Sequence, residues 1–289
     1  NDGDLDLILS GLNDSTGVTA LYRNDLGTTF SSVPTNLPYI SNGHLAWGDC
    51  DNDGRPDLAL AGIGEAGDIT EIHRNLGKGH FVVLARLPGF LNCSLAWNDF
   101  DRDGDLDLAV TGVSWDLDKV ATRIFRNDRL KFTDLQADIP GVYGQYNTFG
   151  DSLAWGDYDG DGQADLIVTG GKDRILPDFI TALFRNQSGE FLAVAPGLAD
   201  FSARNSNLAW GDADNDGDLD LVLIGDDGNS TLGKLLLNQG GAFSDSGAIL
   251  ASTNRGQCAF TDVDGDGRLD IQISGFFWND DSEGVYDNY

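Results

Sequence analysis

The chain has 289 residues, of which 40% are apolar, and its formal net charge is −29. This apolar fraction is enough for a packed core and excludes intrinsic disorder, while no apolar run approaches the roughly 18–20 residues of a membrane-spanning helix. The strong negative charge, without a basic stripe, argues against nucleic acid as a partner, and the lack of a long apolar run predicts no membrane insertion.

A repeat of about 50 residues runs along the chain. Five copies of a strand-type segment, Leu-Ala-Trp-Gly-Asp or a variant of it, begin at residues 45, 95, 153, 208 and 258, and a truncated copy opens the chain at Asn1. An Asp/Gly-rich loop, a β-type run such as 108–112, a segment such as Leu21-Tyr22-Arg23-Asn24 and a short strand around a phenylalanine follow in turn. The pattern predicts four short strands per repeat and no helix.

Four antiparallel strands in every repeat predict an all-β fold, a β-propeller of four-stranded antiparallel blades. A solenoid fits less well, because its repeats are typically shorter and carry one or two strands each. The first copy lacks its first strand and the last copy lacks its fourth, so we expect six or seven blades and a longer chain or assembly. The single domain is divided into approximate repeats 1–38, 39–88, 89–140, 141–198, 199–250 and 251–289, with the first and last incomplete.

The loops share the motif Asp-x-Asp-x-Asp-Gly-x-x-Asp, and only four of the 47 acidic residues in the chain are Glu. Alternate side chains of a tight turn converge, so positions 1, 3 and 5 direct oxygens to one point, and glycine at position 6 permits a positive φ. The carbonyl of position 7 and the Asp of position 9 complete a flexible oxygen shell, which suits Ca²⁺ better than Mg²⁺.

The predicted calcium ligands, from positions 1, 3, 5, 7 and 9, form five complete sites and one partial site at the N-terminus. They are Asp49, Asp51, Asp53, Arg55 and Asp57; Asp99, Asp101, Asp103, Asp105 and Asp107; Asp157, Asp159, Asp161, Gln163 and Asp165; Asp212, Asp214, Asp216, Asp218 and Asp220; Asp262, Asp264, Asp266, Arg268 and Asp270; and, in the partial site, Asp2, Asp4 and Asp6.

Two alternatives to this calcium loop fit the pattern less well. Asp/Gly turns without metal would leave four mutually repelling carboxylates within nine residues, five times over. An EF-hand needs a Glu at position 12, where this chain has Leu60, Val110, Val168, Leu223 and Ile273. Calcium loops of extracellular modules often bind with Kd of roughly 10⁻⁴–10⁻³ M. The ions are therefore expected to be structural, and the protein to lie outside the cell or on its surface.

The motif Leu-Ala-Trp-Gly-Asp-x-Asp-x-Asp-Gly-x-x-Asp-Leu, followed by Leu-Tyr-Arg-Asn, resembles the FG-GAP/VCBS repeats of integrin-α-like β-propellers. The resemblance covers essentially the whole chain. It implies calcium in the loops between the first and second strands of each blade, on one face, and partners bound on the opposite face. The last copy departs from the pattern with Phe260-Thr261 in place of Trp-Gly.

Aromatic residues in the connections on that opposite face are candidates for ligand contact. Trp115 and Trp278 fall between second and third strands, and Tyr39, Tyr143 and Tyr146 fall between repeats. Such rings beside Asp and Asn can recognise a glycan or a protein, or they can simply pack their loops. The predicted function is an adhesion or recognition module, with a structural domain of a larger surface assembly as the alternative.

The sequence contains no recognisable catalytic set. His44, His73 and His80 are scattered, and no Ser/His or Cys/His arrangement recurs. Cys50, Cys93 and Cys258 are unevenly spaced, which supports neither a disulfide framework nor a zinc site. We therefore expect no enzymatic activity. The less favoured alternative is that the chain is a non-catalytic or catalytic part of a polysaccharide-degrading enzyme.

Overall fold

The computed structural model describes residues 5–14, 16–25, 27, 29–143, 153–172, 178–194, 197–227 and 230–276. Within these ranges 21 strands form six antiparallel sheets, and one 3-10 turn, η1, spans Ala199–Phe201. The prediction of an all-β fold built from repeated four-stranded antiparallel sheets is confirmed. No helix in the described part of the chain is long and apolar enough to cross a membrane.

The sheets are named sheet 1 to sheet 6 in chain order, and in each the strands lie in sequence order. Their strands are β1 (Leu7–Asn13), β2 (Thr16–Asp25) and β3 (Thr29–Val33); β4 (Ser41–Gly48), β5 (Asp57–Gly64), β6 (Gly67–Asn75) and β7 (Phe81–Leu87); β8 (Leu91–Asn98), β9 (Asp107–Ser114), β10 (Lys119–Asp128) and β11 (Lys131–Asp134); β12 (Leu153–Gly156), β13 (Asp165–Gly171), β14 (Phe179–Gln187) and β15 (Glu190–Val194); β16 (Arg204–Gly211), β17 (Asp220–Asp226), β18 (Thr231–Gln239) and β19 (Ala242–Asp245); and β20 (Asn254–Thr261) and β21 (Asp270–Phe276).

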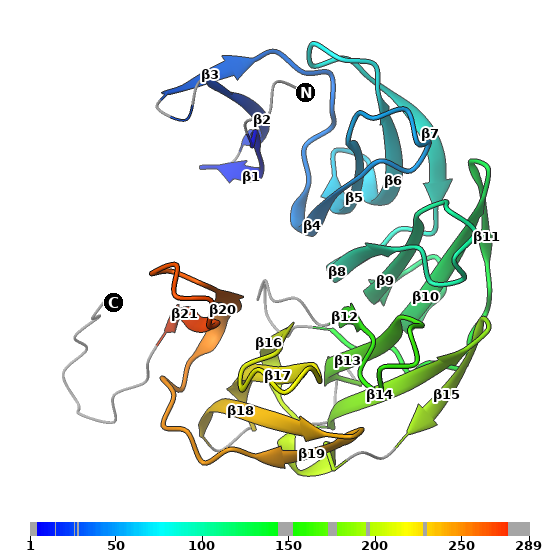
Figure 1. Cartoon of the computed structure of the whole chain (residues 1–289). Coiled ribbons are helices and arrows are strands. Elements are labelled where there is room, and N and C mark those ends of the chain that lie inside the picture. Colours follow the sequence, from blue (N-terminus) through cyan, green and yellow to red (C-terminus); the bar gives the residue numbers. More distant parts are fainter. Residues whose placement is uncertain are drawn as a thin grey trace.

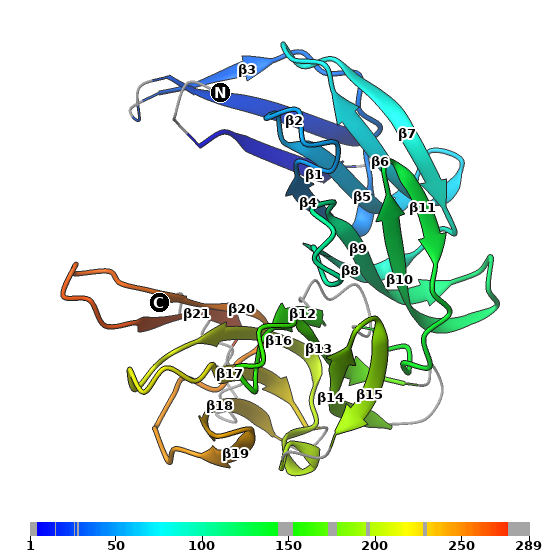
Figure 2. The same ribbon diagram turned by 45° about the vertical axis from the view of Figure 1, so that its right-hand side comes forward.

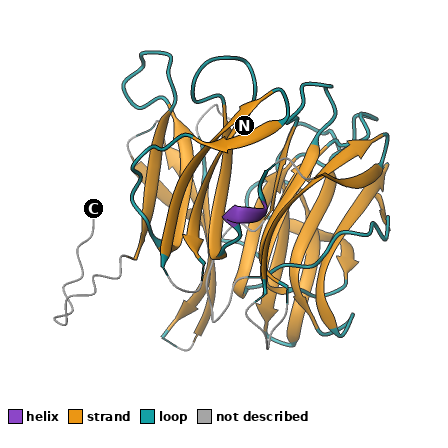
Figure 3. Ribbon diagram, turned by 90° about the horizontal axis from the view of Figure 1, so that it is seen from below, coloured by secondary structure: helices purple, strands orange, loops and turns teal. Residues whose placement is uncertain are grey.

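The six sheets follow one another along an arc, with β4, β8, β12, β16 and β20 on its inner side (Figure 1, Figure 2). The described residues form this arc and not a closed ring. Seen from the side, the strands run between loops at their two ends (Figure 3). Sheets 2 to 6 are antiparallel meanders in which the loops that join the first strand to the second lie at one end of the molecule. In sheet 1, β1 corresponds to the second strand of the other sheets, because its register with β2 matches that of β5 with β6.

The hydrophobic core lies between neighbouring sheets. Five clusters of buried side chains occupy the five seams from sheet 1 to sheet 6. The second strands β9, β13 and β17 are buried along their whole length. Strands that are covered on both faces read as nearly continuous apolar runs, which explains segments such as Leu108–Gly112.

The Trp-Gly pair of the strand motif is a contact between sheets. Trp97 Nε1 donates a hydrogen bond to the Ala46 carbonyl at 3.1 Å, and a Cβ placed on Gly48 would lie 2.8 Å from the Trp97 ring. A Cβ on Gly156 would lie 2.7 Å from Trp210. Glycine ends the innermost strand because the indole of the next sheet packs directly on its backbone.

Candidate metal centres

The nine-residue loops that join the first and second strands are named by their sheets: loop 2 (49–57), loop 3 (99–107), loop 4 (157–165), loop 5 (212–220) and loop 6 (262–270). All five have a left-handed residue at position 6, a glycine with φ between 84° and 97°. Position 4 is left-handed too, with φ between 58° and 76°. Asn or Gly occupies it in four loops, which is a signal that sequence reasoning missed, and Arg102 occupies it in loop 3.

Each loop brings three carboxylates together, with one oxygen of each within 4.8 Å of the others. In loops 3 to 6 these come from positions 1, 3 and 9, and in loop 2 from positions 1, 3 and 5. The predicted convergence of positions 1 and 3 is therefore present in all five loops, whereas position 5 belongs to the group only in loop 2. The groups are Asp49, Asp51 and Asp53; Asp99, Asp101 and Asp107; Asp157, Asp159 and Asp165; Asp212, Asp214 and Asp220; and Asp262, Asp264 and Asp270.

Backbone N–H groups hold these carboxylates in place. In loop 4 the Gly162 N–H donates to Asp157 Oδ2 at 2.7 Å. At position 9, Asp165 accepts from the N–H of Asn186 at 2.8 Å with one oxygen and from the N–H of Tyr158 at 3.2 Å with the other. The remaining loops repeat these bonds in large part, so the loops themselves orient the carboxylates.

Two oxygens of the position-1 carboxylates have no such donor. Asp99 Oδ1 and Asp157 Oδ1 are shielded from solvent and accept no hydrogen bond from the described residues. An anionic oxygen that is buried without a partner is costly, and a cation at the centre of the loop would satisfy it. The surrounding donors are hard carboxylate oxygens, which are the ligands that Ca²⁺ prefers, so the residues present fit calcium.

Burial raises the pKa of two position-9 residues, Asp107 and Asp165. It raises the pKa of Asp107 to about 7, and the negative charge of Asp101 adds to this, while the Asn127 N–H opposes it. Burial likewise raises the pKa of Asp165 to about 6. A divalent cation in the loop would favour the ionised form of both groups.

The asparagine of the Leu-Tyr-Arg-Asn segment connects each loop to the next sheet, which sequence reasoning also missed. Asn186 Nδ2, on β14, donates to the Phe100 carbonyl of loop 3 at 2.8 Å and to the Ala164 carbonyl of its own loop at 3.1 Å. Asn127 bonds in the same way to Cys50 of loop 2, and Asn238 to Tyr158 of loop 4. Each of these loops is therefore fixed by two sheets.

The arginine of the same segment reaches the loop carboxylates in two sheets. Arg185 lies 2.8 Å from Asp159 and 2.9 Å from Asp161, and Arg74 forms ion pairs with Asp51 and Asp53. The segment itself is visible in the sequence, but its spacing does not reveal that this side chain turns towards the loop.

Position 7 was predicted to contribute a carbonyl, and its side chains have a separate role. Asp105, Gln163 and Asp218 accept N–H bonds at 2.8–2.9 Å from the turn between the third and fourth strands. Arg55 donates from Nε to the Asn75 carbonyl at 2.8 Å. These bonds attach the loop to the neighbouring turn of its own sheet.

The partial first loop is described only at position 9. Asp6 Oδ1 accepts the Asn24 N–H at 2.9 Å, as the equivalent residues of the complete loops do. Asp2 and Asp4 lie outside the described residues.

The candidate ligand aromatics differ in exposure. Trp115 follows β9, at the end opposite the loops, and is 54% exposed. Tyr143 is buried at 5% exposure, and the Tyr39 ring lies against the Gly17 backbone, so both pack their connections. Trp278 and Tyr146 lie outside the described residues.

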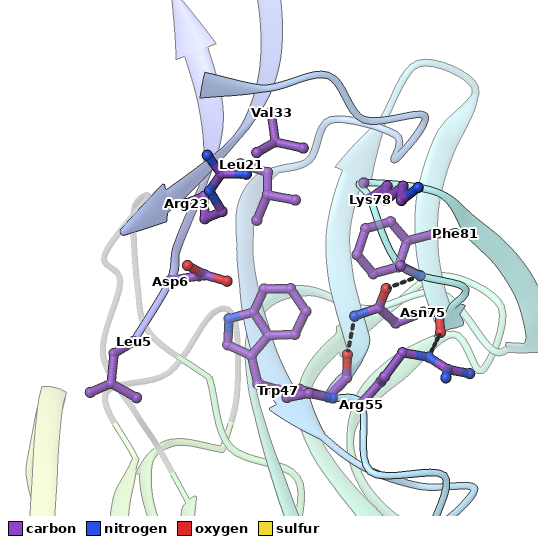
Figure 4. Close-up of a pocket in the computed structure, with 13 residues that line it drawn as sticks. Leu5, Asp6, Leu21, Arg23, Val33, Trp47, Arg55, Asn75, Lys78 and Phe81 are labelled. Atoms are coloured by element: carbon purple, nitrogen blue, oxygen red, sulfur yellow. Dashed lines mark hydrogen bonds between the residues drawn. The ribbon is translucent and has the colours of Figure 1, made fainter. Parts of the chain in front are cut away.

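A pocket of about 750 Å³ lies at the loop end, between sheets 1 and 2, with Trp47, Phe81 and Leu21 in its lining (Figure 4). In the seam between sheets 3 and 4 the residue at position 2 of the loop, Phe100, stacks on Trp155 with ring centroids 6.0 Å apart. The pocket borders Trp47, the residue of sheet 2 that corresponds to Trp155.

The other candidate reactive groups are enclosed. The three cysteines are buried and form no disulfide with one another, and burial raises the pKa of Cys93 to about 12. His73 is buried, and its Nε2 lies 2.8 Å from Glu71, which in turn pairs with Arg86 at 2.9 Å. Burial lowers the pKa of His73, and the hydrogen bond to Glu71 partly offsets this.

Comparison with known proteins identifies the family. The FG-GAP-like repeat model matches residues 1–60, 49–110, 99–168 and 212–272, which together include more than half of the chain. The chain therefore belongs to the FG-GAP-like repeat family, and the predicted resemblance is confirmed. No curated protein matches the chain.

Two solved structures are similar to it. A lectin of Agrocybe aegerita, described as specifically recognising non-reducing terminal N-acetylglucosamine, is 19% identical with a TM-score of 0.57, over 98% of this chain and 78% of the lectin. The V. cholerae biofilm matrix protein Bap1 is 16% identical with a TM-score of 0.45, over 83% of this chain and 35% of Bap1. The first likeness supports the fold.

Proposed function

We propose that the chain is a calcium-stabilised β-propeller of six or seven blades, in which the described sheets are successive blades and loops 2 to 6 each hold one Ca²⁺. The arc of sheets with the first strands innermost supports the propeller. The observation that carries the calcium proposal is the pair of buried, unpaired oxygens, Asp99 Oδ1 and Asp157 Oδ1. Each of them belongs to a converging group of three carboxylates.

Calcium in this proposal has a structural role outside the cell. A site with Kd near 10⁻⁴ M contributes about 1.4–1.8 kcal/mol to the free energy of unfolding at roughly 1–2 mM calcium. The ion would also neutralise part of the charge of −29. Sites of this strength would be empty at cytosolic calcium concentrations, which is why we propose an extracellular or cell-surface location.

We propose that the module recognises a glycan or protein ligand and is not an enzyme. Its sheets are locked together by seam contacts, which gives a rigid scaffold for surface loops, and Trp115 is an exposed aromatic at the end opposite the calcium loops. The likeness in fold to a lectin that recognises N-acetylglucosamine makes glycans the first ligand class to test.

A glycan array in 2 mM calcium, repeated with excess chelator, tests recognition. The proposal predicts selective binding that disappears with chelator and weakens in Trp115→Ala. Leu192→Ala is a matched control, because Leu192 is also an exposed apolar residue, at 45%, but lies on the outer strand β15. Absence of binding by folded, calcium-loaded protein would contradict the glycan proposal and direct the search to protein partners.

A further inference from the structure

Two arginines on third strands make the same contacts with the loops of their own sheets. Arg185, on β14, places Nε 2.8 Å from Oδ2 of Asp159 and Nη2 2.9 Å from Oδ2 of Asp161. These are positions 3 and 5 of loop 4. In sheet 2, Arg74 on β6 uses the same two nitrogens on the same two loop positions. The recurrence in separate sheets indicates a built feature.

Among the described residues, sheets 3 and 5 lack this contact. In sheet 3 the equivalent Arg126 pairs with Asp128 at 2.8 Å and forms no ion pair with loop 3 among the described residues, although its charge acts on Asp101 of that loop. In sheet 5 the equivalent residue on β18 is Leu237. Among the described residues, no lysine or arginine forms an ion pair with the four motif carboxylates of loop 5, Asp212, Asp214, Asp216 and Asp220. The chain therefore carries calcium loops with and without a resident cation.

A guanidinium remains protonated at any pH at which the protein is folded. In loop 4 it lowers the net charge of the four motif carboxylates from −4 to −3, so the empty loop suffers less repulsion and attracts a divalent cation less strongly. The Arg185 side chain is 35% exposed, so solvent screens this effect, and it is expected to be moderate.

We propose that Arg74 and Arg185 are resident counter-ions, which stabilise loops 2 and 4 when these are empty and weaken their affinity for calcium relative to loop 5. This inference rests on the proposed calcium function. It assigns the loops a graded affinity, so that loop 5 fills at a lower calcium concentration than loops 2 and 4.

Each loop contains its own reporter for the test. The position-6 glycine N–H donates to the position-1 carboxylate, in loop 4 from Gly162 to Asp157 and in loop 5 from Gly217 to Asp212. NMR of protein labelled with ¹⁵N-glycine, titrated with calcium, therefore follows single loops. We expect the Gly217 signal to reach half-saturation at a calcium concentration about three- to ten-fold lower than the Gly162 signal.

Exchanging the side chains should exchange the behaviour. Arg185→Leu is expected to tighten calcium binding at loop 4 about three- to ten-fold and to lower the Tm in excess chelator. Leu237→Arg should have the opposite effects at loop 5 and remains informative if Arg185→Leu does not fold. Arg126→Leu is the control, because Arg126 belongs to sheet 3 and its ion pair is with Asp128 and not with loop 4, and it should leave the affinity of loop 4 unchanged.

Arg185→Lys separates charge from geometry, because lysine keeps the charge but cannot reproduce the two-nitrogen contact. A counter-ion role predicts affinity close to that of the original protein. The proposal is wrong if Arg185→Leu leaves calcium affinity unchanged, or if both Arg185 variants weaken it, which would make the arginine a residue that positions the ligands. If the original protein binds no calcium at any glycine reporter, the proposed function itself fails, and the two failures are thus distinct.

Discussion

At the scale of single residues, loops 3 and 4 combine a fixed framework with an unsatisfied centre. Backbone N–H groups hold one oxygen of the position-1 carboxylate and both oxygens of position 9, as in loop 4 around Asp157 and Asp165. The other position-1 oxygen is buried without a donor in these two loops, whereas in loops 2, 5 and 6 it accepts a backbone N–H. A loop ordered in this way loses little conformational entropy when it binds a cation, because its ligands already converge.

The first prediction concerns that unsatisfied oxygen. Asp157→Asn removes the negative charge at position 1 of loop 4, so the variant should lose about 1.4–1.8 kcal/mol of stability in millimolar calcium. It should lose much less in excess chelator, because it also relieves repulsion within the loop. Thermal unfolding of the variant and the original protein in each buffer measures the two losses of stability. Asp200→Asn is the control, because Asp200 is exposed and lies outside the loops. Equal losses in the two buffers would contradict a metal-ligand role.

The second prediction concerns pH. Burial keeps the pKa of His73 below that of an unfolded histidine, so the unfolded chain takes up a proton that the folded protein resists. Stability should therefore fall as the pH drops through about 6.5. His73→Phe introduces the residue found at the equivalent positions Phe125 and Phe184, and it should lose less stability than the original protein between pH 7.5 and 5.5.

Urea unfolding at pH 7.5 and 5.5 measures how much the free energy of unfolding falls in each protein. Glu71 and Arg86, the charged neighbours of His73, are left unchanged in the variant. Parallel losses of stability in the variant and the original protein would contradict the assignment of the acid sensitivity to His73.

At the scale of elements, stability depends on contacts between neighbouring sheets. The indole of one sheet lies on the glycine that ends the innermost strand of the preceding sheet, as Trp97 does on Gly48. The asparagines Asn127, Asn186 and Asn238 bind the loop of one sheet to the third strand of the next sheet. Folding of a calcium loop is thus coupled to the packing of two sheets.

The third prediction tests this coupling. Asn186→Ala removes the donor to the buried Phe100 carbonyl and to the partly buried Ala164 carbonyl, and should cost about 1–3 kcal/mol. Asn75→Ala is the matched control, because the Asn75 side chain donates to Pro56 within its own sheet and not to a preceding loop. Its loss, measured by urea unfolding in calcium, should be smaller. An equal or larger loss in Asn75→Ala would contradict a stabilising role for the inter-sheet bond.

Much of the strand pattern and the ligand spacing could be predicted because both repeat at short range. The polar loop, and the apolar run that follows it, as in Leu108–Gly112, can be recognised in the successive copies. The contacts that depend on how sheets pack could not be predicted: the turn of Arg185 towards Asp159, the bond from Asn186 to Phe100 and the burial of Tyr143 all depend on side-chain directions. The position-4 conformation lay between the two, because Asn and Gly at that position signal it.

At the scale of the whole molecule, the core is divided among five seams and the charge is concentrated in the loops. Each seam joins only two neighbouring sheets, so the stability of the arc is expected to depend on the sum of the contributions of the seams. In the proposed function, calcium bound in the loops stabilises several seams at once, at the end of the sheets where the carboxylates lie.

The most direct test of the account is differential scanning calorimetry of the intact chain in 2 mM calcium, in 2 mM magnesium and in excess chelator, at constant ionic strength. Calcium should raise the Tm in a saturable, concentration-dependent manner, by much more than magnesium does, with dialysis showing several bound calcium ions per chain. An identical Tm in calcium and in chelator, with no bound calcium after dialysis, would contradict the proposal that these loops are calcium sites.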